Sequence, residues 1–406
     1  MRVAIVGGGA AGFFAAINIK RLCPRAEVTI YEASAAVLAK VKVSGGGRCN
    51  LTNSFEQIAN LNQAYPRGER LIRQCFKSFD YNDTYEWFER EGVALTTQDD
   101  CCVFPLSQSS QQIIDTFVRL SGELKIDVVC NFRINKIEKE ESLFILKTDN
   151  QTIECDIVVA TTGGSRNTGA YDLYQELPLQ LEELAPSLFG FDIADKSLCD
   201  VAGAVVEAAE VRVKGSRAKA CGALLITHWG VSGPVVLNLS AYVAKDIKDC
   251  GYKFQILINW SGQTEDSVLR EIRDLSAKYA KKLISSTPPF NLTSRLWEHI
   301  IGRAKVPLER RWSELGSKGI NRIVATLISD EYDVVGRSRQ KPGFTTAGGV
   351  SLKSINTSTL EARNCQRLFL AGEVLDVDAI TGGFNFQAAW STAYCVAKSI
   401  HALYEE

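Results

Sequence analysis

Directly after Met1 the sequence reads Arg2-Val3-Ala4-Ile5-Val6-Gly7-Gly8-Gly9-Ala10-Ala11-Gly12, and the prediction of the fold rests on this segment. Its apolar, β-branched start predicts a strand, its glycines predict a tight turn, and the alanine-rich residues 13–20 predict a helix. A second apolar run, residues 28–31, ends at Glu32, which lies 20 residues after Gly12. This order and spacing match the fingerprint of a dinucleotide-binding strand–turn–helix unit.

Each glycine of the turn has a physical role in such a unit. Gly7 permits the tight turn out of the strand, and Gly9 has no side chain to keep a pyrophosphate away from the backbone. Gly12 allows the helix to pack closely against the strand. We therefore expect these three positions to contact or shape a nucleotide site.

The helix start and Glu32 complete the predicted nucleotide site. Ala10 and Ala11 lie in the first helical turn, where free N–H groups and the helix dipole attract phosphate. The Glu32 carboxylate can accept hydrogen bonds from ribose hydroxyls, and its charge would repel a 2′-phosphate. The pattern favours FAD or NAD over NADP at this site.

Bulk composition limits the classes of function. A length of 406 residues predicts two or three domains, and the net charge of −1 gives no electrostatic case for a nucleic-acid or membrane partner. The fingerprint starts at residue 2 and no apolar run approaches a membrane span, so we expect a cytoplasmic protein. The 12 cysteines form no C-x-x-C pair, and with 3 histidines we expect mostly buried thiols and no metal site.

A second glycine-rich segment follows the fingerprint, with the sequence Ser44-Gly45-Gly46-Gly47-Arg48-Cys49-Asn50-Leu51-Thr52-Asn53. Its backbone-rich, polar character is poor for a core and suits a ligand cradle, with a flexible surface loop as the alternative. Arg48 is a candidate for binding a flavin phosphate or a substrate anion, since guanidinium groups pair well with both. The phosphate role is favoured.

Two later strands also end in small residues. Residues 156–161 form an apolar run that leads into Thr162 and Gly163, where the backbone can approach a bound nucleotide; a generic strand exit is the alternative. Residues 367–371 lead into Gly372 and Glu373. In a flavoprotein, Glu373 would bond a ribityl hydroxyl.

A long helix is predicted near the C-terminus, from about residue 386 to 403. Gly383, Asn385 and Phe386 lie at its start, so an anionic or carbonyl group can sit at the positive end of its dipole. In a flavoprotein this group would be the N1/C2=O edge of the isoalloxazine ring. Residues 126–152 read as a strand meander, whereas residues 187–341 change in character and predict an insertion.

Several blocks of sequence resemble a known family, the bacterial NAD(P)/FAD-dependent oxidoreductases of the aminoacetone-oxidase, YhiN or BaiN type. They are the opening glycine turn, the Ser44–Asn53 segment, Thr227-His228-Trp229-Gly230-Val231-Ser232-Gly233-Pro234, Thr346-Ala347-Gly348-Gly349-Val350, and Ala371-Gly372-Glu373-Val374-Leu375-Asp376-Val377-Asp378 with Gly382-Gly383-Phe384-Asn385-Phe386-Gln387. The blocks occur in the family's order and span nearly the whole chain. Cys101-Cys102-Val103 and residues 169–174 depart from the family pattern, which puts the substrate in doubt.

The resemblance implies an α/β fold: a Rossmann-like FAD-binding domain, with a parallel sheet and a β-meander, and an inserted domain. The expected bounds are 1–187 and 342–406 for the FAD-binding domain and 188–341 for the insert. Within the insert, the expected barrel-like part is 188–262 with 331–341, and the small helical part is 263–330. By position, the resemblance carries FAD contacts onto the Gly7–Gly12 turn, Glu32, the Gly45–Asn50 loop, Glu373 and Asn385, and adds Lys40 on a loop and Ile134 on the meander.

The function expected from these features is FAD-dependent oxidation or reduction of an unidentified small organic molecule by hydride transfer through non-covalently bound FAD. It would be either a reductase of a conjugated C=C bond or an oxidase of an amine. Only one dinucleotide fingerprint is present, so NAD(P)H would dock transiently as a co-substrate. We expect no nucleic-acid or membrane partner, although a flavin-containing RNA-binding or RNA-modifying protein and a non-catalytic flavin sensor remain alternatives.

His228 and Ser232 are the best candidates in the insert for acid/base catalysis or substrate orientation. An imidazole can exchange protons near neutral pH. A structural turn is the alternative role for this segment, and it is slightly favoured.

Overall fold

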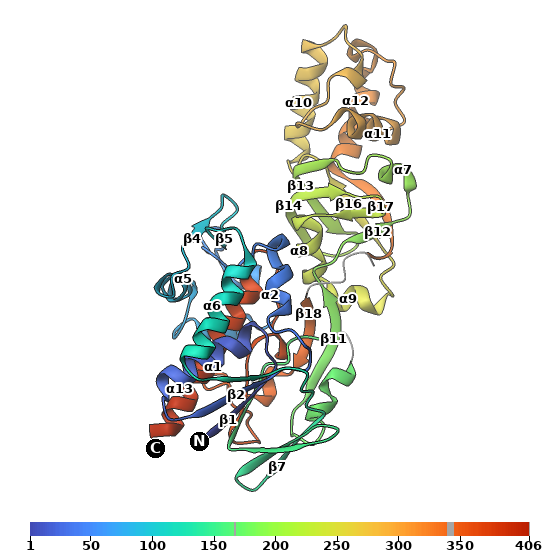
Figure 1. The fold of residues 1–406 in the computed structure, drawn as a ribbon. Helices are drawn as coiled ribbons and strands as arrows, with labels where there is room; N and C mark the ends of the chain where they lie inside the picture. The colour runs from blue at the N-terminus through green and yellow to red at the C-terminus, as the bar shows by residue number, and fades with distance from the viewer. Residues whose placement is uncertain (166–167, 339–344, 406) are drawn as a thin grey trace. The chain divides into compact units, whose positions relative to one another are not determined.

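The computed structural model describes residues 1–165, 168–338 and 345–405, and the chain divides into two compact units (Figure 1). Met1–Ala185 and Thr345–Glu406 form the first, here called the terminal unit, and Pro186–Phe344 form the second, here called the insert. The predicted domain boundary between residues 341 and 342 lies outside the described residues.

The terminal unit is built on a five-stranded parallel sheet in the order β19-β10-β1-β2-β6. Its strands are Arg2–Val6 (β1), Glu27–Tyr31 (β2), Asp127–Val129 (β6), Ile157–Ala160 (β10) and Leu368–Leu370 (β19). Strands β1, β10 and β19 are almost wholly buried, as expected for parallel strands covered on both faces. The sheet therefore joins both ends of the chain, and the predicted Rossmann-like fold is confirmed.

Two long helices, α1 (Ala10–Leu22) and α13 (Phe384–Glu405), pack against each other beside this sheet (Figure 1). Phe14 of α1 lies 5.2 Å from Trp390 of α13 and 4.7 Å from Trp87, measured between ring centroids. All three side chains are 1% exposed or less. Aromatic packing therefore fixes the C-terminal helix onto the helix that follows the glycine turn. The other helices of this unit are α2 (Ala39–Val43), α3 (Leu61–Ala64), α4 (Glu69–Cys75), α5 (Tyr81–Arg90) and α6 (Ser110–Glu123).

Three smaller sheets complete the strands of the terminal unit and its connection to the insert. β3 (Thr52–Asn53), β5 (Cys102–Pro105) and β4 (Leu95–Thr97) form one sheet, and β11 (Leu181–Ser187) pairs with β18 (Thr345–Val350) in another. The third is a meander of β7 (Lys136–Glu140), β8 (Leu143–Lys147) and β9 (Thr152–Cys155). It confirms the predicted meander in part, because residues 127–129, which were predicted to begin it, form β6 of the parallel sheet instead.

The insert contains a closed antiparallel barrel in the order β12-β15-β14-β13-β16-β17. Its strands are Phe191–Ile193 (β12), Val205–Val213 (β13), Lys219–Ile226 (β14), Gly230–Ser232 (β15), Phe254–Asn259 (β16) and Asp330–Arg337 (β17). Buried Val206, Val211, Ile256 and Ile258 alternate with more exposed neighbours, the period-two pattern of a sheet with one buried face. The helices α7 (Lys196–Cys199), α8 (Pro234–Tyr242) and α9 (Ala244–Asp249) accompany the barrel.

A small helical part interrupts the barrel between β16 and β17 and consists of α10 (Glu265–Lys278), α11 (Ser294–Arg303) and α12 (Gly316–Ile328). Trp297 and Trp312 are at most 1% exposed and stack at 6.4 Å in its core. The fold class predicted for the insert, a barrel with a small helical part, is confirmed.

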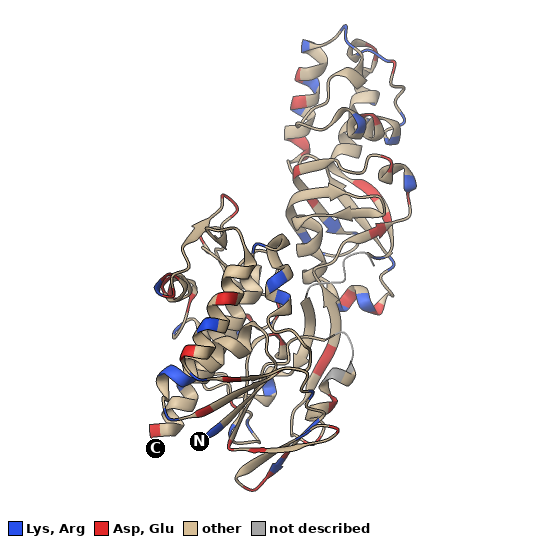
Figure 2. Ribbon diagram, in the orientation of Figure 1, with Lys and Arg blue, Asp and Glu red and all other residues tan. Residues whose placement is uncertain are grey.

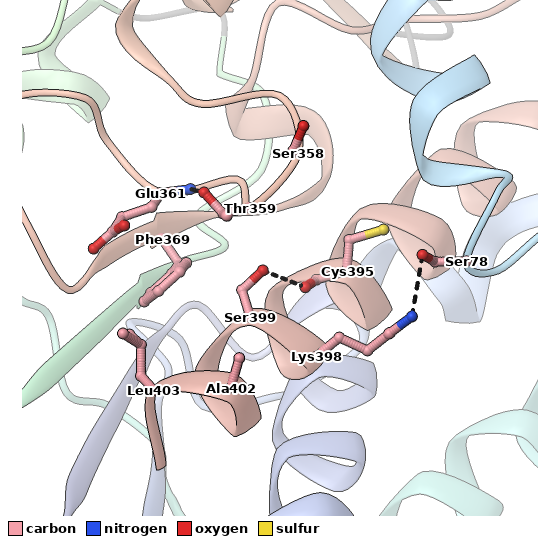
Figure 3. Close-up of a pocket in the computed structure, with 10 residues that line it drawn as sticks. All are labelled: Ser78, Ser358, Thr359, Glu361, Phe369, Cys395, Lys398, Ser399, Ala402 and Leu403. Carbon is pink, nitrogen blue, oxygen red and sulfur yellow. Dashed lines mark hydrogen bonds between the residues drawn. The ribbon is translucent and has the colours of Figure 1, made fainter. Parts of the chain in front are cut away.

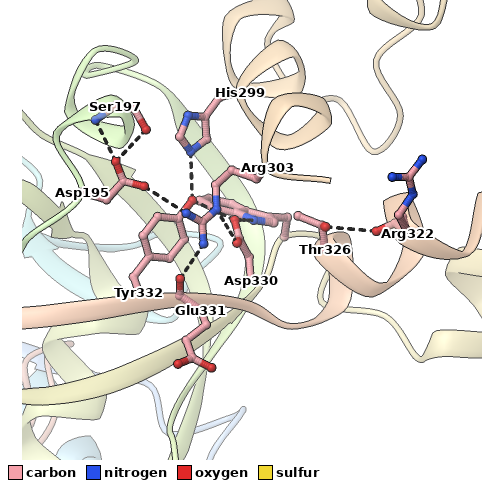
Figure 4. A network of polar contacts seen from close by, with 10 residues as sticks. Asp195, Ser197, His299, Arg303, Arg322, Thr326, Asp330, Glu331 and Tyr332 are labelled. Atoms are coloured by element: carbon pink, nitrogen blue, oxygen red, sulfur yellow. Dashed lines mark hydrogen bonds and ion pairs between the residues drawn. The ribbon is translucent and has the colours of Figure 1, made fainter. Parts of the chain in front are cut away.

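A buried polar network holds the helical part to the barrel (Figure 4). Asp330 accepts hydrogen bonds from Arg303 Nε at 2.7 Å, Tyr332 OH at 2.7 Å and Trp260 Nε1 at 3.1 Å. Arg303 also contacts Asp195 at 3.0 Å, and Tyr332 OH lies 2.9 Å from His299 Nε2. Burial raises the pKa of Asp330 and of Tyr332 and lowers the pKa of His299.

No helix in the described part of the chain is long and apolar enough to cross a membrane. All 12 cysteines are free thiols, and eight of them are buried, which confirms the prediction that most are buried.

Candidate functional site

The opening turn has the geometry that its glycines predicted. Gly7 has φ +116°, and a Cβ atom at this position would lie 2.4 Å from the Thr161 carbonyl oxygen. A Cβ at Gly12 would lie 2.0 Å from the Gly7 carbonyl oxygen, so the turn and helix α1 are in close contact there. Gly9, by contrast, has no atom within 4 Å of its Cβ position. The turn is thus closed on its protein side and open at Gly9, where a ligand can contact the backbone.

Ala10 and Ala11 begin helix α1, and the residue before it, Gly9, supplies no side-chain cap. The first helical hydrogen bond runs from Phe13 N–H to the Gly9 carbonyl oxygen. The N–H groups that precede it have no partner within the helix, which makes this helix start a site for anions.

Glu32 lies against the turn. Its carboxylate accepts hydrogen bonds from Gly8 N–H at 2.8 Å, from Ser34 N–H at 2.8 Å and from Ser34 Oγ at 2.7 Å. A carboxylate has about four lone-pair sites, so about one remains for a ribose hydroxyl. Gly8 and Ser34 therefore orient the carboxylate for the predicted ribose contact without exhausting its acceptor capacity.

The Ser44–Asn50 loop follows helix α2. Gly45, Gly46 and Gly47 all have positive φ, and the Cβ positions of Gly46 and Gly47 are open. Ser44 Oγ donates to the Val41 carbonyl oxygen at 2.8 Å. Asn50 carries a buried Oδ1 that accepts no hydrogen bond from the described residues. The loop thus offers exposed backbone and one buried acceptor without a partner.

Arg48 is used mainly within its own loop. Its Nε donates to the Gly45 carbonyl oxygen at 3.0 Å, its Nη1 reaches Gln108 Oε1 at 3.3 Å, and its guanidinium lies 4.2 Å from the Phe104 ring centroid. These contacts stabilise the loop. Binding of a phosphate or a substrate anion by Arg48 stays a prediction.

The exit of strand β10 meets both the turn and the C-terminal segment. Thr161 Oγ1 donates to the Gly7 carbonyl oxygen at 2.9 Å, and Thr162 Oγ1 lies 2.9 Å from Tyr174 OH. Gly163 has φ +74° and an open Cβ position, whereas a Cβ at Gly164 would lie 2.5 Å from Glu373 Oε1. The predicted strand exit therefore lies beside Glu373.

Glu373 connects three distant parts of the chain. It accepts hydrogen bonds from Lys40 Nζ at 2.5 Å and from Thr346 N–H at 2.8 Å. The neighbouring Gly372 has φ +75°, donates its N–H to Thr392 Oγ1 at 2.9 Å, and lies against Ala11. The ion pair gives Lys40 a partner in the site, although its side chain is 58% exposed.

The start of helix α13 lies against strand β3, which follows the Ser44–Asn50 loop. A Cβ at Gly383 would lie 2.2 Å from the Thr52 carbonyl oxygen, and Asn53 Nδ2 donates to the Gly382 carbonyl oxygen at 3.0 Å. The Asn385 side chain accepts from Ala379 N–H and donates to the Ala379 carbonyl oxygen, both at 3.0 Å. The amide of Asn385 therefore holds its own loop, and a direct FAD contact by this residue stays a prediction.

Phe386 and Ile134, two further predicted FAD contacts, pack mainly against other residues of the chain. Phe386 is half-buried and stacks on Trp390 at 5.6 Å. Ile134 is 8% exposed and precedes strand β7 rather than lying within it. The preceding Phe132 donates its N–H to the Glu32 carbonyl oxygen at 2.8 Å, which brings this segment to the ribose side of the predicted site.

His228 and Ser232 belong to the insert. His228 is exposed in the turn between β14 and β15, where Thr227 Oγ1 and the backbone of Thr227 and Gly230 make the turn's hydrogen bonds. Ser232 is half-buried at the end of β15. A catalytic role for either residue stays a prediction.

Some residues of this region were missed as site residues. Thr346 and Gly348 donate their N–H groups to Glu373 and Asp376, which ties strand β18 to the C-terminal segment. Asp378 is fully buried and paired with Arg67. The sequence marks these residues through the block from Thr346 to Val350 and through Asp376 and Asp378. It does not show which residues they contact.

A separate cavity of about 390 Å³ lies beside the C-terminal half of α13 (Figure 3). Its lining includes Ser78, Cys395 and Lys398, and none of the predicted FAD contacts. A hydrogen bond between the Cys75 and Cys395 thiols raises the pKa of Cys75 and lowers that of Cys395. The cavity is thus distinct from the glycine-rich site.

The terminal unit therefore brings the turn, Glu32, the Ser44–Asn50 loop, the β10 exit and the start of α13 into one region. The open Cβ position at Gly9, the helix starts and the free Asn50 acceptor suit a ligand with phosphates, hydroxyls and N–H donors. This combination defines an FAD-binding flavoprotein of the Rossmann type.

The chain belongs to the family described as HI0933-like protein Rossmann domain, whose model matches residues 1–399. This membership confirms the resemblance inferred from the sequence blocks, and it supports FAD as the cofactor and oxidoreduction as the class of reaction.

Named relatives are similar over nearly the full length. The chain is 27% identical to a 3-dehydro-bile acid delta(4,6)-reductase of Clostridium scindens, over 98% of both chains. It is 26% identical to a ribosomal RNA dihydrouridine synthase of Escherichia coli, over 98% of this chain and 97% of the relative. Among solved structures, a 3-ketosteroid delta1-dehydrogenase from Sterolibacterium denitrificans shares the fold, with 12% identity, a TM-score of 0.50 and 99% of both chains covered.

Proposed function

We propose that this protein is an FAD-dependent reductase that adds a hydride and a proton across a carbon–carbon double bond conjugated to a carbonyl. The observation that carries the proposal is the assembly of the site from both chain ends, where Glu373 meets Lys40 and Gly164, and Gly383 meets Thr52. Such a site supports an FAD-dependent redox reaction, and FAD, when bound, supplies the hydride transfer.

The names of two relatives support the choice of a conjugated double bond. A delta(4,6)-reductase of a 3-dehydro-bile acid acts on double bonds conjugated to a ketone, and a dihydrouridine synthase reduces the C5–C6 double bond of a uracil ring. Both substrates place the alkene next to a carbonyl group that can accept the developing negative charge. A reductase is therefore favoured here over an amine oxidase.

The residues of the chain have distinct parts in this proposal. The turn around Gly9 and the start of α1 bind the phosphates, and Glu32 accepts a hydrogen bond from ribose. NADH or NADPH docks transiently as electron donor, because the sequence has a single dinucleotide fingerprint. His228 donates the proton to the substrate carbon next to the carbonyl, and Ser232 orients the substrate.

A stopped-flow experiment tests the reaction. The purified FAD-loaded protein is mixed anaerobically with NADH or NADPH, and the visible absorbance of oxidised flavin is followed; a panel of conjugated enones is then added without oxygen. We expect bleaching by at least one donor and recovery with an enone. Bleaching that only oxygen reverses would contradict the proposal and favour an oxidase.

His228→Ala tests the proton donor. Loss of a general acid typically costs about 10²- to 10⁴-fold in rate. We therefore expect slower enone turnover with unchanged FAD content and unchanged bleaching by the nicotinamide donor. Full turnover in this variant would leave His228 as a structural turn residue.

A uracil base in RNA is the second candidate substrate within the same chemistry. Its support is the name of the Escherichia coli relative and an excess of Lys and Arg in the insert, with 23 of them against 17 Asp and Glu over residues 186–344. RNA that gains the mass of two hydrogens after incubation with the protein and NADPH would identify this substrate class. We further propose a cytoplasmic location, since 12 free thiols suit a reducing compartment.

A further inference from the structure

Charge is distributed unevenly along the chain. The net charge is −1 overall, but residues 264–329, the helical part of the insert, contain 12 Lys and Arg against 7 Asp and Glu. The terminal unit has the opposite balance, with 23 Lys and Arg against 30 Asp and Glu. The helical part is thus a basic segment in a chain whose total charge conceals it (Figure 2).

Five exposed basic residues gather at the end of α10 and in the segments between α10 and α12. We call this cluster the basic tip; it consists of Lys278, Lys281, Lys282, Arg310 and Arg311. Backbone contacts bring its two segments together: Leu283 bridges to Arg311, Ile284 N–H donates to the Arg310 carbonyl oxygen, and Trp312 N–H donates to the Lys282 carbonyl oxygen. The fold therefore assembles the cluster from residues about 30 positions apart.

No carboxylate in the described part of the chain forms an ion pair with the basic tip. Other basic residues of the insert, such as Lys214, Lys219 and Arg303, do form ion pairs. Glu314 accepts from the backbone N–H of Arg311, and Arg310 donates to the backbone carbonyl of Glu314. All five residues of the tip are exposed to solvent.

An aromatic ring lies among these charges. Tyr279 is half-buried, with Lys278 Nζ 5.2 Å and Lys282 Nζ 4.7 Å from its ring centroid. Basic groups interleaved with an aromatic ring suit single-stranded nucleic acid, because the cations bind phosphates and the ring provides a stacking surface. An anionic membrane would call for an apolar face, whereas Leu283, 43% exposed, is the sole exposed apolar side chain between residues 278 and 283.

We propose that the basic tip binds the phosphodiester backbone of RNA. This inference rests on the second substrate class of the proposed function, and it assigns the helical part of the insert the task of holding the RNA whose base is reduced. Because phosphate contacts release counterions, binding weakens as salt rises.

Fluorescence anisotropy with a labelled RNA tests the proposal on the full-length FAD-loaded protein, between about 50 and 200 mM salt. The test variant is Lys281→Glu with Lys282→Glu. The matched control is Arg217→Glu with Lys253→Glu, which makes the same charge change at exposed positions of the barrel part. FAD content and melting temperature establish that each variant is folded, and vesicles with anionic lipid replace RNA in a parallel series.

We expect the wild type to bind RNA, and the test variant to bind roughly tenfold more weakly, with a salt slope smaller by about 0.7 for each phosphate that it no longer neutralises. The control should retain its affinity. Absence of binding at low salt, equal weakening in both variants, or vesicle binding that alone depends on Lys281 and Lys282 would overturn the proposal.

Failure of this inference is distinguishable from failure of the proposed function. Enone reduction without RNA binding would leave the reductase intact and remove the RNA surface. RNA binding that depends on the basic tip, without any flavin-dependent reduction, would support the surface and contradict the reductase.

Discussion

The terminal unit and the insert use polar groups in opposite ways. In the terminal unit, contacts such as Lys40 with Glu373 surround backbone that remains open at Gly9 and a buried acceptor, Asn50 Oδ1, that has no partner in the described residues. In the insert, Asp330 receives three hydrogen bonds from its own unit. Open backbone and a buried acceptor without a partner indicate a ligand site. A carboxylate whose hydrogen bonds all come from its own unit indicates structural support.

The largest expected effect tests the closed network. Arg303→Met leaves Asp330, 4% exposed, without its cationic partner. Removing one member of a buried ion pair typically costs about 3–5 kcal/mol, so we expect a decrease of this size in the free energy of unfolding of the insert. Denaturant titration followed by tryptophan fluorescence measures it.

Two further variants sharpen this test. Arg322→Met changes an exposed arginine of the same helical part and should stay within about 0.5 kcal/mol of the wild type. Adding Asp330→Asn to Arg303→Met should restore part of the stability, because the buried charge is removed as well. If Arg303→Met lowered FAD content before any unfolding of the insert, the assignment of this network to structural support would be contradicted.

An intermediate effect tests the open site. Gly9→Ala adds a Cβ where no protein atom lies within 4 Å, so the stability of the FAD-free protein should change little. The same Cβ would keep the pyrophosphate away from the backbone, and we expect about tenfold weaker FAD binding. Gly122→Ala, which is equally unobstructed but lies on helix α6, is the control. Titration calorimetry with FAD measures both, and equal affinities would remove Gly9 from the site.

The smallest expected effect is a pH dependence of the insert. Burial lowers the folded-state pKa of His299 below its ordinary value of 6.5. The contribution of His299 to the free energy of unfolding is therefore fully present above pH 6.5, and it is lost as pH falls through the folded-state pKa of this residue. Asp330, whose folded pKa is raised by burial, acts in the opposite direction, with its contribution full below pH 3.8 and lost as pH rises.

His299→Gln isolates the histidine contribution, because an amide can still contact Tyr332 OH but does not titrate. Between pH 7.5 and 5.5, roughly one unit either side of an ordinary histidine pKa, the melting temperature of the wild type should fall more than that of the variant. Parallel profiles would show that the burial of His299 does not affect stability.

The sequence predicted structure correctly where that structure depends on local spacing. The strand, turn and helix of residues 1–32 follow from β-branched residues, glycines and alanines, and the start of α13 follows from the glycines before it. The sequence does not predict contacts between residues far apart along the chain, because no local pattern links Lys40 or Thr346 with Glu373. Asn385 was predicted to contact FAD, but its amide oxygen accepts a hydrogen bond from Ala379 N–H within its own loop.

The net charge of the whole chain also differs from the charge of its parts. The net charge of −1 suggested no nucleic-acid partner, but it is a sum over a negative terminal unit and a positive insert. The basic tip forms only when residues 278–282 meet residues 310–311 in the fold. Charge counted by structural region, rather than over the whole chain, is the quantity that bears on partners.

Release and identification of the cofactor from the purified protein tests whether both ends of the chain form one FAD site. The protein is denatured without proteolysis, and the soluble flavin is separated by chromatography and quantified against the chain. We expect non-covalent FAD in an amount equimolar with the chain. A protein that contains FMN, or that binds no flavin after incubation with excess FAD, would contradict it.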